Sequence, residues 1–119
     1  MLGGGPVYPV ADYFESGTTL ELGRDDRELD GSYSKKVRWI GAGYTGPVFI
    51  RIHRIDAAGT GLVRFSDWGV QRDGGYYADL PTPNTDLPAV TTVGGPGCYA
   101  YQVDGATFTT TIVFRAVVD

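Results

Sequence analysis

The sequence contains very little of the chemistry that metal proteins and many enzymes depend on. Its 119 residues include one cysteine and one histidine, which excludes an internal disulfide and a histidine-based zinc cluster. No apolar run approaches the roughly 18 residues of a membrane helix, so we expect no membrane insertion. The net charge of −4 argues against nucleic-acid binding, which requires clustered Lys and Arg. We expect no cofactor, no metal and no catalytic activity.

The composition indicates a folded, turn-rich domain. Hydrophobic residues make up 42% and aromatic residues 13% of the chain, enough to form a core, while 18 glycines and 7 prolines supply many turns. The length is typical of one domain. We expect a flexible Gly-rich segment over residues 1–15 and a single domain over residues 16–119.

The first residues show no targeting signal. Residues 1–6 lack both the basic start and the apolar run of a signal peptide. A Gly-rich N-terminal segment is typical of a flexible tether. We therefore expect an extracytoplasmic protein, secreted or anchored in the cell envelope, whose leader has been removed. A cytoplasmic location is the alternative.

Hydrophobic periodicity predicts strands and no helix. Over residues 108–118, Phe108, Ile112 and Phe114 fall on one face and Val113 and Arg115 on the other, which is the two-residue period of a strand. Further alternating or β-branched runs cover residues 18–22, 36–40, 48–55, 62–65, 91–93 and 98–103. The Asp104-Gly105 pair between two such runs predicts a hairpin with a type I′ turn.

About seven short strands separated by turn signals are typical of an Ig-like sandwich of two antiparallel sheets. A small barrel is the alternative architecture. The inward positions of the predicted strands give the expected core: Leu20, Leu22, Val37, Trp39, Val48, Ile50, Ile52, Tyr99, Tyr101, Val103, Ile112 and Phe114.

One tyrosine pattern favours the sandwich. In Ig-like domains a tyrosine near the start of one strand bonds back to nearby backbone, two residues before a core position. Tyr99 would take that role, Tyr101 would fill the core position, and Trp39 would be the core indole. The blocks 36–39, 43–48, 96–105 and 112–116 resemble a family of small bacterial secreted proteins and lipoproteins. This resemblance implies an extracytoplasmic Ig-like domain and no particular activity.

The segment 66–88 holds the candidate binding residues. It is rich in Gly, Pro and Asn, so we expect a long irregular excursion, and such loops often carry function. We select Trp68, Tyr76 and Tyr77 as binding residues, with Asp67 and Gln71 as polar neighbours. These rings could cap the core, anchor a protein partner or stack on a glycan.

Other reactive side chains have simpler interpretations. Cys98 is expected to be structural, with an intermolecular disulfide as the alternative. His53 reads as an outward-facing strand residue. Asp25, Asp26, Glu28 and Asp30 form an acidic cluster without the spacing of a calcium loop, so a solvated charged loop is favoured.

The sequence therefore predicts a non-catalytic protein-interaction or structural module of the bacterial cell envelope. It would act through its loop aromatics or through self-association at a strand edge, because the long apolar run 108–118 could pair with another chain. The alternative is a carbohydrate-binding module that uses Trp68, Tyr76 and Tyr77.

Overall fold

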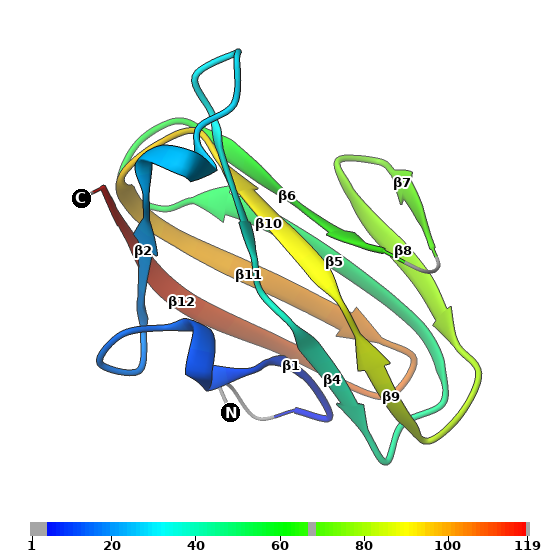
Figure 1. Cartoon of the computed structure of the whole chain (residues 1–119). Helices are drawn as coiled ribbons and strands as arrows, with labels where there is room; N and C mark the ends of the chain where they lie inside the picture. The colour runs from blue at the N-terminus through cyan, green and yellow to red at the C-terminus, as the bar shows by residue number, and fades with distance from the viewer. Residues whose placement is uncertain (1–4, 67–68, 119) are drawn as a thin grey trace.

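The computed structural model describes residues 5–66 and 69–118, and this part of the chain is all-β, with no α-helix (Figure 1). Its strands are β1 (Val7–Pro9), β2 (Thr19–Leu22), β3 (Tyr33–Lys36), β4 (Trp39–Ala42), β5 (Gly46–Arg54), β6 (Thr60–Phe65), β7 (Val70–Arg72), β8 (Gly75–Leu80), β9 (Asn84–Leu87), β10 (Ala89–Val93), β11 (Gly97–Gly105) and β12 (Thr109–Val118). Two short 3₁₀ turns, η1 (Ala11–Tyr13) and η2 (Arg24–Asp26), flank β2.

Hydrogen bonding divides the strands into two sheets. A small sheet has the order β1-β4-β9, and a large one has the order β2-β12-β11-β5-β6-β10-β3. Strand β8 also pairs with β5 and carries β7 at its outer edge. All pairs are antiparallel except β2 with β12. Figure 1 shows β3, β4, β9 and β10 crossing in front of β5, β11 and β12, so the fold is sandwich-like, with two layers.

The front layer contains one long ladder with a single interruption. Lys36 pairs with Val90 and Trp39 with Leu87, so the pairings β3–β10 and β4–β9 keep the same register. The interruption lies at Pro88, which has no backbone N–H to donate to a ladder. Such an interruption divides one predicted strand into two, which is one reason why the structure has twelve strands and not the seven or so expected.

Side chains from both layers meet in one core. Every residue that the sequence predicted for the core is buried, including Trp39 and Tyr101, which are fully enclosed. The Trp39 and Tyr101 rings meet edge to face, with their centroids 5.0 Å apart. The Tyr101 ring in turn stacks on Phe114 at 4.6 Å. Edge-to-face and offset-stacked pairs add to the stability gained by burying the rings.

The predicted role of Tyr99 in backbone bonding is confirmed. Its buried hydroxyl donates a hydrogen bond to the carbonyl of Gly95 at 2.9 Å, four residues upstream. Two residues further on, the Tyr101 hydroxyl bonds the buried Thr91 hydroxyl at 2.8 Å. Both polar tips are therefore satisfied inside the core.

The segment 66–88 is more regular than expected. It contains β7, β8 and β9, because Gly75 to Leu80 alternate and pair with the first half of β5. Asp73 and Gly74 form the turn between β7 and β8, with φ of 51° and 79°. Positive φ at both central positions is the signature of the type I′ turn, which the sequence predicted at Asp104-Gly105.

The final hairpin exists, but its turn is not at Asp104-Gly105. Asp104 pairs with Thr109, and the Gly105 N–H donates to the Phe108 carbonyl at 2.9 Å, so the chain turns after Gly105. A Cβ on Gly105 would overlap the Phe108 ring. Glycine is therefore required here because the ring covers its backbone, not because the turn needs positive φ.

The N-terminal segment also differs from the flexible tether expected over residues 1–15. Strand β1 pairs with β4, and Val7 and Phe14 are buried in the core. The sandwich therefore begins before residue 16.

Candidate functional site

The outer face of the back layer carries two aromatic rings side by side. Phe49 on β5 is directly opposite Tyr77 on β8, and Tyr77 is opposite Val70 on β7. Both rings are half-buried, while Val70 is 54% exposed. Directly opposite residues on neighbouring strands point to the same face. The three side chains therefore form a continuous apolar strip on the surface, which we call the aromatic strip.

Two guanidinium groups cover the aromatic strip. The Arg72 guanidinium lies 4.3 Å from the centre of the Tyr77 ring, and the Arg51 guanidinium lies 5.6 Å from that of Phe49. Cations in this position are attracted by the electron-rich face of the ring. Arg51 also pairs with Asp104 at 3.2 Å. In the described part of the chain no carboxylate lies within 4 Å of Arg72, so its charge remains available to a ligand.

A hydrogen-bond network continues this face toward the last hairpin. Gln102 donates to Asp104 at 3.0 Å and to Thr109 at 2.9 Å, and accepts from Thr111 at 3.0 Å. The Thr109 hydroxyl also donates to Asp104. Hydrogen bonds from Thr109 and Gln102 lower the pKa of the Asp104 carboxyl, because they stabilise its charged form. The face thus presents ordered polar groups beside the two rings.

The structure places the predicted site residues in three different environments. Tyr77 lies on the outer face, whereas Tyr76 is buried, 5.5 Å from the Phe65 ring, with its hydroxyl bonded to the Phe65 carbonyl at 3.2 Å. Gln71 pairs with Tyr76 in register and so points away from the Tyr77 face. Asp67 and Trp68 lie outside the described residues. Among the predicted residues that the structure describes, only Tyr77 belongs to the aromatic strip.

Sequence reasoning missed Phe49, Arg51 and Val70 as parts of this surface. Because Val48, Ile50 and Ile52 of this strand face the core, its alternation directs Phe49 and Arg51 outward, but nothing in the strand shows which segment lies beside it. The signal that could have located the partner was the Asp73-Gly74 turn, because it defines the hairpin that carries Val70 and Tyr77.

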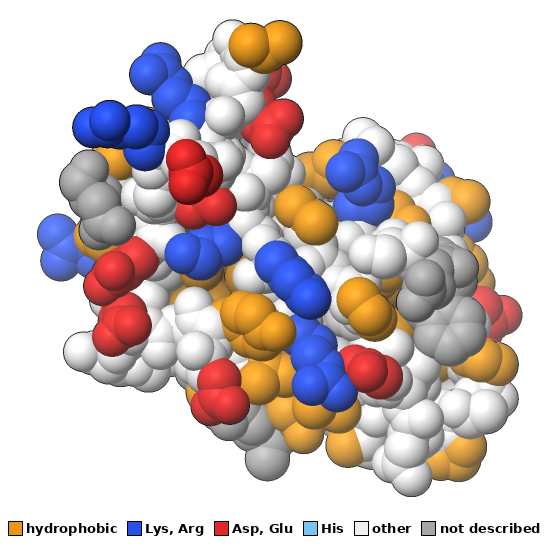
Figure 2. Space-filling model, viewed as in Figure 1, with side chains coloured by type: hydrophobic (Ala, Val, Ile, Leu, Met, Phe, Trp, Pro, Cys, Tyr) orange, Lys and Arg blue, Asp and Glu red, His pale blue; other side chains and the backbone are white. Residues whose placement is uncertain are grey.

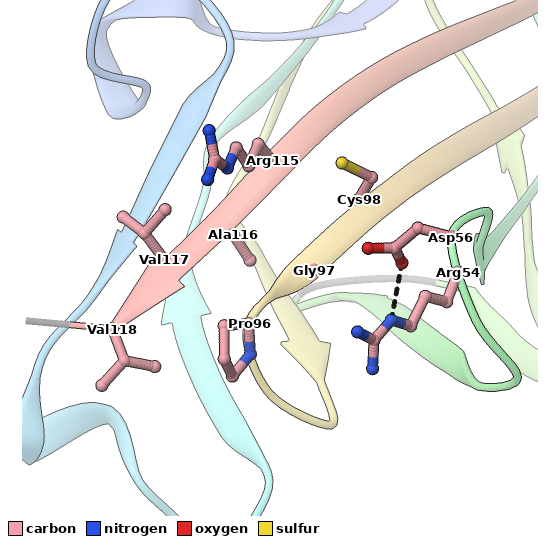
Figure 3. A pocket seen from close by; sticks show the side chains of 9 residues that line it. All are labelled: Arg54, Asp56, Pro96, Gly97, Cys98, Arg115, Ala116, Val117 and Val118. Carbon is pink, nitrogen blue, oxygen red and sulfur yellow. Dashed lines mark hydrogen bonds and ion pairs between the residues drawn. The ribbon is translucent and has the colours of Figure 1, made fainter.

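Cys98 lies in an open pocket where β11 begins and β12 ends. The pocket has a volume of about 450 Å³ and is lined by Arg54, Asp56, Pro96, Gly97, Cys98, Arg115, Ala116, Val117 and Val118 (Figure 3). Cys98 is a free, half-buried thiol opposite Arg115 in the ladder. Arg54 bonds Asp56 at 2.7 Å, and this hydrogen bond lowers the pKa of the Asp56 carboxyl. We call this hollow the terminal pocket.

The remaining polar candidates are dispersed. His53 is exposed on β5, with Ala100 and Thr60 as its neighbours in the ladder. Asp26 lies 3.8 Å from Lys35, while Asp30 accepts two hydrogen bonds from Ser32. Across residues 5–66 and 69–118, no three His, Cys, Asp or Glu side chains gather closely enough to hold a metal ion.

In comparisons with known proteins, no family model, no curated protein and no solved structure matches this chain. The described residues also form no helix that is long and apolar enough to cross a membrane.

Proposed function

We propose that this chain is a non-catalytic interaction module with an Ig-like sandwich, which binds a partner protein through the aromatic strip. The observation that carries the proposal is the pair of outer rings, Phe49 and Tyr77, each covered by an arginine. Tyrosine and arginine are enriched among the residues that dominate protein–protein binding energy. No carboxylate among the described residues pairs with Arg72, so an acidic group on the partner protein would form an ion pair with it.

Strand pairing supports the Ig-like part of this proposal. In Ig domains the strands A, B, E and D share one sheet, and C, F and G share the other. Here the ladder of β3 and β4 with β10 and β9 resembles the pairing of B with E, and the neighbours β5, β11 and β12 resemble C, F and G. The Tyr99 hydroxyl, two residues before the core ring of Tyr101, matches the tyrosine corner of that fold.

The surroundings of His53 favour binding over catalysis. A catalytic histidine is oriented by an acid and contacts a nucleophile. No side chain in the described part of the chain forms a hydrogen bond or ion pair with His53, which lies exposed on the outer side of β5. The proposed location in the bacterial cell envelope rests on the resemblance of the sequence blocks around Trp39 and Tyr99.

Site-specific photo-crosslinking in the source cells tests the proposed surface. A photoactivatable amino acid at Val70, beside Tyr77, should give one adduct of defined mass. The adduct should disappear when Tyr77→Ala is added, because that change removes the ring at the centre of the strip. The matched control position is Lys36, an exposed residue of the front layer. No adduct from Val70, or the same adducts from both positions, would overturn the proposal.

Carbohydrate binding is the second proposal. Tyr77 presents a ring on the outer face, and on the opposite face of the β7–β8 hairpin Gln71 lines a groove together with Ser32, Thr60 and Thr92. Such side chains could bond sugar hydroxyls. A glycan array with the wild type, Tyr77→Ala and Trp68→Ala tests this function. Absence of any glycan signal from the wild type would contradict carbohydrate binding. A signal that both variants retain would show that the glycan does not bind at these rings.

A further inference from the structure

A loop over residues 27–32 projects from one end of the molecule and carries an exposed leucine. The loop joins η2 to β3 and extends beyond both layers at the top of Figure 1. Leu29 is 109% exposed, so its side chain contacts water as fully as it would in an extended peptide. Single exposed apolar residues are common on protein surfaces, but this one lies on a loop held away from the rest of the fold. We call this segment the tip loop.

Backbone and side-chain bonds hold the tip loop in one shape. The Glu28 N–H donates to the Ser32 carbonyl at 2.7 Å, and the Gly31 N–H donates to the Glu28 carbonyl at 3.0 Å. The backbone N–H and the hydroxyl of Ser32 both donate to one Asp30 carboxylate oxygen, at 2.9 and 2.7 Å. Gly31 has a φ of 91°, which glycine adopts readily. Leu29 is thus presented in an ordered loop, and preorganisation reduces the entropy lost on binding.

Charge decides what kind of surface the tip loop fits. The loop shows Glu28 and Asp30 on either side of Leu29, and Arg27 at its base. Figure 2 shows acidic, basic and hydrophobic side chains gathered on the projecting part of the molecule at the top of the view. A complementary site is therefore an apolar hollow with a cationic rim. The negative flanks argue against an anionic lipid surface as the partner.

The terminal pocket of this same chain has those properties. Pro96, Val117 and Val118 supply apolar atoms, and Arg115 also lines the pocket (Figure 3). Asp56 neutralises Arg54, whereas no carboxylate lies within 4 Å of Arg115 among the residues that the structure describes. Arg115 therefore offers a positive charge to a ligand of this pocket. A volume of about 450 Å³ is ample for one leucine side chain.

We propose that the tip loop of one copy docks in the terminal pocket of a second copy, with Leu29 against the apolar lining and Glu28 or Asp30 facing Arg115. The proposal goes beyond the function given above, because it uses surfaces separate from the aromatic strip and makes a second copy of the chain a further partner. The two surfaces differ, so copies either exchange loops in a closed pair or add head to tail. One loop in a shallow pocket covers less area than a standard interface, so the association is weak.

Sedimentation analysis over a range of concentrations, in reducing buffer, tests the proposal. The wild type should pass from monomer to larger species as its concentration rises. Leu29→Ala should lower the association constant about tenfold, because it removes the apolar anchor. Val113→Ala is the matched control: it removes an exposed apolar side chain that belongs neither to the tip loop, nor to the terminal pocket, nor to the aromatic strip, and the association should stay unchanged. A wild type that remains monomeric throughout, or one that Leu29→Ala does not affect, overturns the proposal.

Two further variants test the charge pairing. Arg115→Glu should weaken association, and the double variant Glu28→Arg with Arg115→Glu should restore it. A mixture of Leu29→Ala and Arg115→Glu should form heterodimers even though each variant alone is impaired, because an intact loop then meets an intact pocket. Failure of both the double variant and the mixture to associate would contradict this pairing.

The single cysteine provides an independent readout. Cys98 lines the terminal pocket, so docking should slow its alkylation as the wild-type concentration rises, and Leu29→Ala should abolish this protection. Association seen only without reductant would assign it to a Cys98 disulfide and overturn the docking. If the protein stays monomeric but still gives the Tyr77-dependent crosslink, the docking of two copies is wrong and the proposed function stands. If that crosslink is absent but the protein still self-associates, the partner protein proposed for the aromatic strip is wrong and the docking stands.

Discussion

Tyr76 and Tyr77 are neighbours in the chain, but they belong to two different aromatic clusters. Tyr76 faces inward, where its ring contacts Phe65 and its hydroxyl bonds a backbone carbonyl. Tyr77 faces outward beside Phe49, and its ring is covered by Arg72. The inner rings are packed by other rings and the outer rings by guanidinium groups. The same residue type thus serves as core on one face of β8 and as surface on the other.

This difference predicts that inner rings determine stability and outer rings determine binding. Removing a buried ring leaves a cavity that the surrounding side chains cannot fill. Removing an outer ring exposes its neighbours to water and forfeits one cation–ring contact.

The largest effect is expected at Trp39, which is fully buried between the rings of Tyr101 and Phe65. Trp39→Ala should lower the free energy of unfolding by about 3–5 kcal/mol, the usual cost of deleting a buried aromatic ring. Urea denaturation followed by circular dichroism measures it. A loss below about 1 kcal/mol would show that this ring does not support the core.

A sharper comparison uses the two adjacent tyrosines. Tyr76→Ala should cost about 3 kcal/mol, because a packed ring and a buried hydrogen bond disappear together. Tyr77→Ala should cost less than about 1 kcal/mol, the range of exposed cation–ring contacts. Thermal and urea unfolding of the two variants measure the difference. Equal losses would contradict the assignment of one ring to the core and the other to the surface.

The third prediction concerns the Tyr101 hydroxyl. Tyr101→Phe should cost about 1–2 kcal/mol at neutral pH, since the buried Thr91 hydroxyl loses its partner. Burial raises the pKa of Tyr101 far above its usual value. Above pH ~10 an unfolded tyrosine releases its proton while folded Tyr101 keeps it, so stability falls as the pH rises.

Urea midpoints measured from neutral to alkaline pH test this linkage. Tyr101→Phe should show a shallower alkaline decline than the wild type. An unchanged slope in Tyr101→Phe would mean that Tyr101 is not the group responsible.

The smallest effect is expected at Asp104, on the outer face. Hydrogen bonds from Thr109 and Gln102 lower the pKa of Asp104, so its contribution to stability is present above pH ~4 and is lost as the pH falls through the lowered pKa. Asp104→Asn should flatten this acid dependence by less than about 1 kcal/mol, because the group is partly exposed. Asp79→Asn, on an exposed carboxyl of the same face, is the control, and an acid profile of Asp104→Asn identical to that of the wild type would contradict the prediction.

Alternation along the strands recognised in the sequence was enough to predict part of the core. The residues expected to face inward are all buried, because a period of two places alternate side chains on one side of a sheet wherever the pairing is made. The Tyr99 hydrogen bond was also predictable, since it joins groups only four residues apart.

The turns show where local reasoning was insufficient. Both Asp73-Gly74 and Asp104-Gly105 have the composition of a type I′ turn, but only the first adopts positive φ at both positions. At the second pair the Phe108 ring covers Gly105, and the Tyr44 hydroxyl accepts a hydrogen bond from the Ala106 N–H at 2.9 Å. Tyr44 is 62 residues from Ala106 in the chain, so nothing in the hairpin sequence reveals this contact.

The candidate site was predictable only in part, for the same reason. Tyr77 was selected as a binding residue from its position in a Gly-rich segment and lies half-buried on the outer face, but Phe49 comes from a strand 28 positions earlier in the chain, opposite Tyr77 in the ladder. Tyr76 and Tyr77 were grouped as one site, although adjacent residues of a strand point to opposite faces. Recognising β8 as a strand would have separated them.

In the strands that it revealed, the sequence by itself determined which side chains lie inside, because alternation of apolar and polar residues is a local property that does not depend on which strand lies beside them. Only the tertiary structure decided which outward side chains share a surface, since that depends on the register between segments far apart in the chain. The aromatic strip exists because β8 pairs with the first half of β5, and the terminal pocket exists because the ends of β11 and β12 meet the turn after β5.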